Sequence, residues 1–123
     1  RYQPTTHQAN VLEPLELDAP KFDSIGLNYL LHCLPGTMQS KQVVFANLKP
    51  LLNDGGVVFG STILGQGIKP NFLARWLMRL YNSKGIFGNS EDNLADLENN
   101  LKTHFREYST KVVGCVAFFE GRL

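Results

Sequence analysis

Apolar runs of strand length alternate along the chain with stretches that have helical spacing. Phe22–Asn28 and residues 57–64 are short apolar runs. The second is rich in β-branched residues, which is typical of a central strand buried on both faces. Residues 6–12 form another extended stretch that predicts a strand. The final stretch, residues 105–121, predicts either two strands that turn near Gly114 or one long bulged strand.

Three further stretches carry apolar residues at the spacing of an amphipathic helix. The first, residues 43–52, follows polar residues that are able to cap its first turn, and Pro50 is expected to bend or interrupt it. A tight turn at residues 53–56 separates this helix from the strand that follows. The other two helices are predicted over residues 72–81 and residues 90–101, the last beginning with a serine N-cap.

The order of elements is strand, strand, helix, strand, helix, helix, strand, strand. This order predicts an α/β sheet covered by helices, with an antiparallel element at its C-terminal end. The 123 residues are 43% hydrophobic and 19% charged, which indicates a globular chain that forms a single domain over residues 1–123. The chain starts at Arg1 in mid-pattern rather than at a methionine, so we expect it to be a domain, a processed product or part of a longer protein.

Charge and cysteine content narrow the classes of partner and site. Twelve Lys and Arg residues against 11 Asp and Glu residues give a net charge of +1, which favours neither nucleic acid nor a membrane surface as a partner. No apolar run approaches the ~20 residues that span a membrane, so a cytoplasmic location is expected. Cys33 and Cys115 lie outside any CxxC pair, and the three histidines lack metal-ligand spacing, so no metal site is predicted.

Two places along the chain are candidates for ligand chemistry. Gly65-Gln66-Gly67 lies between a predicted strand and helix, as phosphate-binding turns do, but Pro70 stands where the third glycine is expected. The hypothesis that the chain is a nicotinamide- or nucleotide-binding domain is supported only by that incomplete pattern. Asn28, Tyr29 and His32 follow an apolar strand, where open α/β sheets form ligand crevices. The alternative is that Asn28 caps the next turn and that Tyr29 packs against the rest of the protein.

Three segments, residues 9–14, 22–36 and 48–60, together resemble the C-terminal half of class I S-adenosylmethionine-dependent methyltransferases. The F-D-x-I segment is similar to the fourth strand of that family. The L-K-P…G-G-V-x-x-F pattern is similar to the helix and turn that lead into the fifth strand, and residues 112–119 are similar to the terminal hairpin strand. The glycine-rich loop of the family, E/D-x-G-x-G-x-G, has no counterpart here. The resemblance implies an incomplete Rossmann-like methyltransferase sheet from the family order 3-2-1-4-5-7-6, with helices on its faces.

The resemblance also implies roles for individual residues. Asn10 and Val11 match the pair that contacts the adenine ring of S-adenosylmethionine, and Asn28 lies at the strand end that faces the methionine part. His32 or Tyr29 would act as general base or orient the nucleophile. The complete protein would transfer a methyl group from S-adenosylmethionine to a small-molecule acceptor. The alternative is a non-catalytic module, derived from the same half-fold, that dimerises or binds a partner.

The family order places the first and second strands between the third and the fourth, so Phe22–Asn28 would border a gap. An unpaired apolar strand exposes backbone donors and acceptors and invites pairing with another chain. We therefore expect this edge to be covered either by residues 6–12 or by a second copy of the protein, which gives a homodimer.

Overall fold

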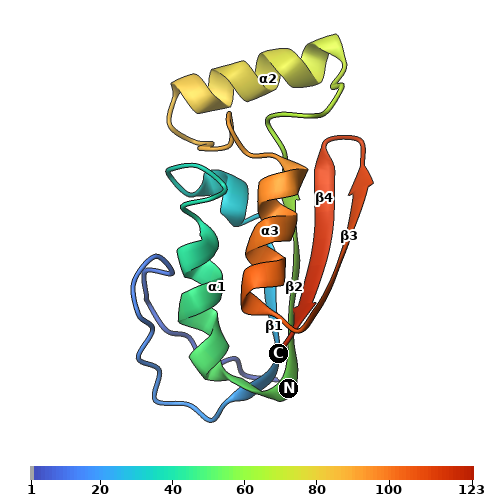
Figure 1. Cartoon of the computed structure of the whole chain (residues 1–123). Helices are drawn as coiled ribbons and strands as arrows, with labels where there is room; N and C mark the ends of the chain where they lie inside the picture. The colour runs from blue at the N-terminus through green and yellow to red at the C-terminus, as the bar shows by residue number, and fades with distance from the viewer. Residues whose placement is uncertain (1) are drawn as a thin grey trace.

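The structure is a computed structural model that describes residues 2–123. A four-stranded sheet carries two helices on one face, and a third helix lies across the end of the sheet (Figure 1). The elements, in chain order, are β1 (Phe22–Asn28), η1 (Leu31–Cys33), α1 (Gln42–Leu48), η2 (Lys49–Leu51), β2 (Leu52–Ile63), α2 (Phe72–Ser83), α3 (Leu94–His104), β3 (Glu107–Val113) and β4 (Val116–Arg122).

The strand order of the sheet is β1-β2-β4-β3. β1 pairs parallel with β2, while β4 pairs antiparallel with both β2 and β3. This arrangement equals the last four positions, 4-5-7-6, of the order that the resemblance implies. The predicted α/β sheet with an antiparallel C-terminal strand is confirmed, and the final stretch forms two strands that turn at Gly114, whose φ is 62°.

Residues 6–12 do not form a strand, and the prediction for this segment is wrong. The side-chain oxygen of Asn10 accepts the N–H of Leu12, and its carbonyl accepts the N–H of Glu13, so the chain turns locally instead of extending. Asn47 of α1 donates to the carbonyl of Val11. The end of the segment, at Val11 and Leu12, therefore lies against α1 and the core. Within residues 2–123 the outer edge of β1 has no strand paired with it.

Several predicted boundaries shift in the structure. The turn expected at residues 53–56 lies inside β2, where Gly55 has a φ of 75° and the register with β1 shifts between Phe22 and Ser24. The last helix begins at Leu94 rather than near residue 90, because Asn93, and not the predicted serine, accepts the N–H of Asp96 as its N-cap. The interruption expected at the proline after α1 is confirmed as the 3-10 turn η2.

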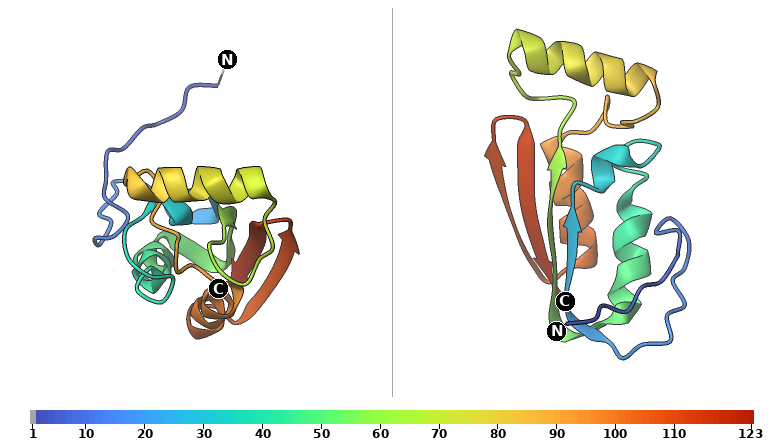
Figure 2. Two further views of the ribbon diagram at one scale, coloured as in Figure 1. Left: turned by 90° about the horizontal axis from the view of Figure 1, so that it is seen from above. Right: turned by 180° about the vertical axis from the view of Figure 1, so that it is seen from behind.

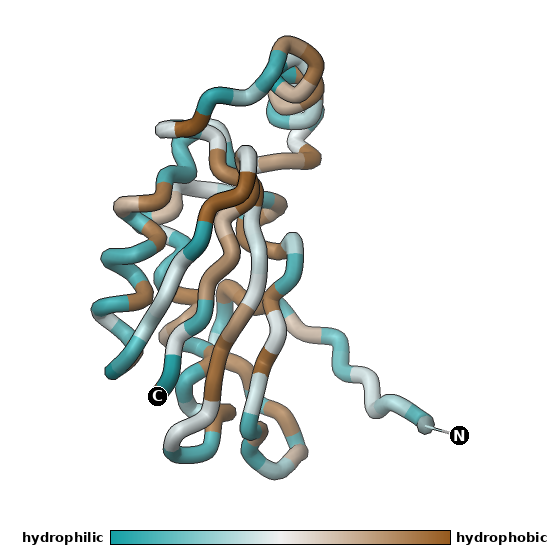
Figure 3. Tube along the Cα trace, turned by 90° about the vertical axis from the view of Figure 1, so that its right-hand side faces the viewer, coloured by the Kyte–Doolittle hydropathy of each residue, from teal (hydrophilic) through white to brown (hydrophobic). Residues whose placement is uncertain are grey.

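The core lies on one face of the sheet only. α1 and α3 both pack on that face, which leaves the strands open on the other side (Figure 2, right). Phe45 of α1 sits in the centre of the core, with its ring centroid 5.8 Å from that of Phe105 and 5.9 Å from that of Phe119. Along β2, Val58 is fully buried whereas Phe59 is 42% exposed. The prediction that this strand is buried on both faces is therefore wrong for residues 2–123, although its apolar run stands out in Figure 3.

Close packing between β1 and β2 predicts effects of different size for alanine substitutions at Gly26 and Gly60. A Cβ added to Gly60 would lie 2.7 Å from the carbonyl carbon of Leu27, a backbone atom that cannot yield without parting the strands. A Cβ added to Gly26 would meet side-chain atoms alone, the nearest being the ring edge of Phe59 at 3.1 Å. We expect Gly60→Ala to lower the free energy of unfolding by about 3 kcal/mol. Gly26→Ala should change it by less than about 1 kcal/mol.

Urea unfolding of both variants tests this difference. Because the two glycines lie on neighbouring rungs of one ladder, Gly26→Ala is a matched control for the loss of glycine flexibility. Equal effects of the two substitutions would contradict the inter-strand contact.

Candidate functional site

The candidate site lies at the carboxyl ends of the two parallel strands, below α2 (Figure 1). The parallel ladder ends at the pair Asn28 and Ser61, where the Ser61 hydroxyl donates to the Asn28 side-chain oxygen over 3.4 Å. The N–H of Tyr29 then donates to the Ser61 carbonyl over 2.8 Å. Asn28 is exposed, so its amide group is accessible at the end of the sheet.

Tyr29 has an unusual backbone at the point where the chain leaves β1. Its φ is 56°, and it is the one non-glycine residue with positive φ among residues 2–123. A bulky residue in this left-handed region is strained, and such strain persists only where the surrounding structure imposes it. The ring is 53% exposed, and its centroid lies 5.7 Å from that of the His32 ring. The strained turn therefore presents an aromatic hydroxyl to solvent beside a buried histidine.

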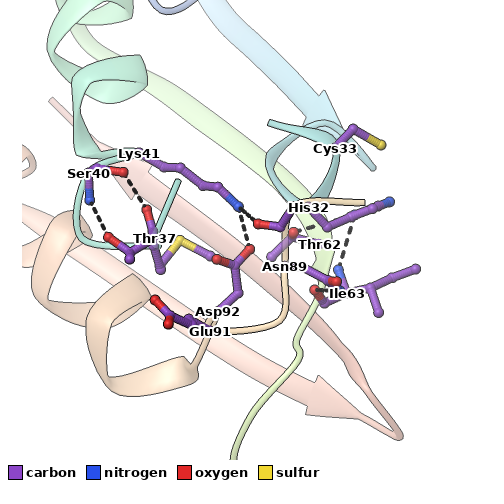
Figure 4. Close-up of polar contacts among 12 residues, drawn as sticks. His32, Cys33, Thr37, Ser40, Lys41, Thr62, Ile63, Asn89, Glu91 and Asp92 are labelled. Atoms are coloured by element: carbon purple, nitrogen blue, oxygen red, sulfur yellow. Dashed lines mark hydrogen bonds and ion pairs between the residues drawn. The ribbon is translucent and has the colours of Figure 1, made fainter. Parts of the chain in front are cut away.

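His32 is buried, with only 3% of its surface exposed, and it is bound to β2 (Figure 4). Its Nδ1 accepts the N–H of Ile63 over 3.2 Å and lies 3.5 Å from the Thr62 hydroxyl oxygen. Burial, assisted by the positive charge of Lys41, lowers the pKa of His32, which favours the neutral ring. In a neutral ring whose Nδ1 accepts, the proton is on Nε2. This geometry suits His32 to donate a hydrogen bond and to orient neighbours, and it disfavours the role of general base.

A buried ion pair fixes the loop that packs on His32. Lys41 donates to the Asp92 carboxylate and to the Gly88 carbonyl, each over 2.7 Å, and both charged side chains are fully buried (Figure 4). The N–H of Gly88 donates in turn to the carbonyl of His32 over 2.8 Å. Burial raises the pKa of the Asp92 carboxyl, and the hydrogen bond and charge of Lys41 oppose that rise.

Asn89 ties the same loop to α2 and to the end of β2. Its side-chain amide donates to the Ile63 carbonyl over 2.9 Å, and its side-chain oxygen accepts from Asn82 of α2 over 2.8 Å. Sequence reasoning missed this residue and Lys41, because no local pattern signals a contact between positions far apart in the chain. Asp92 falls within the helix predicted over residues 90–101, whereas the helix itself begins two residues after it, at Leu94.

The predicted site residues fall into two groups. Asn28, Tyr29 and His32 lie together at the end of β1, whereas Asn10 and Val11 lie beside the last turn of α1. The roles predicted for all five remain predictions. Within residues 2–123, no group of three or more His, Cys, Asp or Glu side chains is arranged to hold a metal ion, and no helix is long and apolar enough to cross a membrane.

No family model matches the chain, but individual curated proteins do. Methyltransferase aurB of Calcarisporium arbuscula is 46% identical over 118 residues, which make up 96% of this chain and 51% of the relative. Demethylluteothin O-methyltransferase of Streptomyces thioluteus is 41% identical over 119 residues, or 97% of this chain and 52% of the relative. The chain thus spans about half the length of the curated relatives it matches.

The fold agrees with these relatives. The solved structure of the S-adenosylmethionine-dependent methyltransferase SibL matches 94% of this chain and 34% of its own with a TM-score of 0.65, at 14% identity. The strand order β1-β2-β4-β3 is the one that the family resemblance implies. The chain is thus similar in sequence to curated methyltransferases and has the fold of a solved S-adenosylmethionine-dependent methyltransferase. In methyltransferase terms, β1 and β2 correspond to the fourth and fifth strands of the family, and the hairpin of β3 and β4 to its sixth and seventh.

The buried ion pair between Lys41 and Asp92 predicts a large loss of stability when one partner is removed. Lys41→Met leaves the Asp92 carboxylate buried without a countercharge, so we expect it to lower the free energy of unfolding by about 3–5 kcal/mol. The double variant Lys41→Met/Asp92→Leu removes both charges and should recover most of that loss. Lys102→Met, at an exposed position of α3, is the control and should cost less than about 0.5 kcal/mol. Denaturant unfolding measures all three, and a double variant no more stable than Lys41→Met would overturn the explanation.

The lowered pKa of His32 predicts how stability depends on pH. As pH falls through about 6.5, the ordinary value, the unfolded chain takes up the proton before the folded chain does, so the free energy of unfolding should decrease. His32→Asn offers a neutral side-chain acceptor to Ile63 and does not titrate. We expect this variant to flatten the decrease between about pH 7.5 and 5.5. Some slope should remain, because burial also lowers the pKa of His104. Urea unfolding across this range is the measurement, and an unchanged slope would contradict the assignment.

Proposed function

We propose that the complete protein transfers a methyl group from S-adenosylmethionine to a small-molecule acceptor, and that residues 1–123 form one domain of it. Curated relatives named as methyltransferases support the reaction class. The observation that carries the proposal is the arrangement at the end of β1, where the exposed Asn28 amide and the strained Tyr29 face solvent below α2. In open α/β sheets this end is where ligands bind.

The residues present suit the methionine end of the cofactor better than its adenosine end. Asn28 uses its side-chain oxygen toward Ser61, which leaves its amide N–H groups able to donate to a carboxylate. The family's glycine-rich loop has no counterpart in the sequence, and Asn10 and Val11 lie beside α1. The cofactor supplies an activated methyl group when it is bound.

The protein's own side chains would position the acceptor. Tyr29 offers an exposed hydroxyl, and the neutral His32 ring packs edge-on against Tyr29 and Phe87. We therefore assign Tyr29 to contact with the acceptor, as general base or as a hydrogen-bonding partner, and His32 to the positioning of Tyr29 and Phe87. Holding the acceptor in line with the methyl group is the main contribution a protein makes to this kind of displacement.

We place this activity in the cytoplasm, where the free thiols of Cys33 and Cys115 stay reduced. One observation favours the alternative, a non-catalytic dimerising module. The outer edge of β1 is unpaired within residues 2–123, and Phe59 and Phe118 are exposed on the open face of the sheet. A homodimer formed through that edge would satisfy the backbone groups of β1.

Thermal unfolding with S-adenosylhomocysteine, the product of the cofactor, tests the proposed function. A ligand at 100 times its dissociation constant stabilises by about 2.7 kcal/mol, which raises the melting temperature on the order of several degrees. We expect such a rise at millimolar ligand, and we expect Asn28→Ala to abolish it. Asn99→Ala, at an exposed position on α3, is the matched control and should keep it.

Asn10→Ala tests the adenine contact separately in the same assay. A cooperative melt without any shift, in a chain that sediments as a dimer, would reject the cofactor site in this chain. That result would support the dimerising module instead.

A further inference from the structure

We propose that α2 and the loop before it bind an organic anion that has an apolar body, and that this anion is the methyl acceptor. The second part of the proposal rests on the proposed function, whereas the binding site itself does not. The site is a cavity of about 470 Å³ between α2, the turn that follows β2 and the loop that leads to α3. Its lining residues are Gly65, Ile68, Pro70, Arg75, Met78, Arg79, Asn82 and Ser90.

The volume and position of the cavity suit a small organic ligand. Ligand cavities in proteins typically have volumes of roughly 300–1,000 Å³ and are lined mainly by apolar groups with a few placed polar ones. Here Ile68, Pro70 and Met78 supply an apolar wall. The cavity lies at the same end of the sheet as Asn28 and Tyr29, because α2 lies across that end (Figure 1).

The charges that line the cavity are all positive. Arg75 and Arg79 are one helical turn apart, so they project from the same side of α2. Among residues 2–123 neither arginine forms an ion pair, and the cavity lining contains no carboxylate. Two guanidinium groups side by side repel each other unless an anion lies between them, and their planar N–H groups bind a carboxylate through paired hydrogen bonds.

The remaining polar groups fit this assignment. Asn82 is already committed, because its side chain donates to the Met78 carbonyl and to Asn89 and accepts from the Asn89 backbone. The Ser90 hydroxyl is the one other polar side chain in the lining, and it is a suitable donor to an anion. The cavity therefore pairs three donor side chains with an apolar wall, which selects a ligand that is anionic at one end and apolar in its body.

A second cavity shares Met78 with this site and is lined by an aromatic side chain that contacts His32. Met78 also lines an apolar cavity of about 180 Å³, together with Tyr81 and Phe87. The ring centroid of Phe87 lies 5.1 Å from that of Tyr81 and 4.7 Å from that of His32. An acceptor with its anionic group on the arginines would therefore extend its apolar body around Met78 toward the aromatic side chains of the candidate site.

Binding of cyclohexanecarboxylate, compared with its neutral amide, tests the proposal. Trp76 lies on α2 between the two arginines and is the only tryptophan, so its fluorescence reports on this helix, and neither probe absorbs where Trp76 does. Isothermal titration calorimetry measures the same affinities independently of the fluorescence response. We expect saturable binding of the carboxylate and at least tenfold weaker binding of the amide.

The double variant Arg75→Gln/Arg79→Gln should weaken carboxylate binding at least tenfold and leave binding of the amide unchanged. Both positions are exposed, so a cooperative melt should be preserved, and Arg79→Gln alone should give an intermediate loss. Arg106→Gln, at an exposed arginine before β3, is the control for a general loss of charge and should bind as the unsubstituted chain does.

Three outcomes would overturn the proposal. The first is equal affinity for the carboxylate and the amide. The second is a carboxylate affinity that the double substitution leaves unchanged. The third is inorganic phosphate that binds as tightly as the carboxylate, because the apolar wall would then contribute nothing to binding. The assay contains no cofactor. A missing thermal shift with S-adenosylhomocysteine would therefore count against the methyltransferase proposal, while carboxylate binding would still decide the anion site.

Discussion

The arrangement at the end of the sheet depends on the buried ion pair between Lys41 and Asp92. Removing two charges from water is costly, and here the 2.7 Å contact is supplemented by one hydrogen bond, which the Lys41 ammonium donates to a backbone carbonyl. This carbonyl is that of Gly88, and the Asp92 carbonyl accepts the N–H groups of Gly65 and Gln66. The segments that enter and leave α2 are thus fixed at one point, although one carboxylate oxygen of Asp92 remains without a hydrogen bond among the described residues.

Two buried polar side chains beside this ion pair, His32 and Asn89, have a structural role at the end of β2. β1 ends opposite Ser61, so the backbone groups of Ile63 lose their partner strand two residues before β2 itself ends. The His32 ring accepts the N–H of Ile63, and the Asn89 amide donates to its carbonyl. Two side chains therefore continue the ladder where the neighbouring strand stops, as buried backbone groups require. The histidine that sequence position suggests as a catalyst is first of all a backbone partner.

Local pattern was sufficient for β1, for the apolar run of β2 and for strand structure in the final stretch, because alternation acts over a few residues. It left open whether that final stretch forms two strands or one bulged strand. The family resemblance then supplied the strand order, which periodicity alone does not contain. Residues 6–12 were mispredicted because the side chain of Asn10 satisfies the backbone locally and competes with strand pairing. The prediction that residues 57–64 are buried on both faces was wrong, because the sequence of a strand does not indicate which face of the sheet the helices cover. The ion pair joins positions 51 residues apart, and no local pattern signals it.

The open face of the sheet does not discriminate between an enzyme and a dimerising module, whereas the end of β1 does. Phe59 and Phe118 are exposed, and either additional chain or a second copy would bury them, so they favour neither function. The strained backbone of Tyr29 does discriminate. Strain of this kind costs about 1–3 kcal/mol, and a surface that serves only for dimerisation gains nothing from it at the end of a strand. A site that must present an aromatic hydroxyl at a fixed angle, at the same end of the sheet as a cavity lined by two arginines, gains a pre-organised position for a ligand.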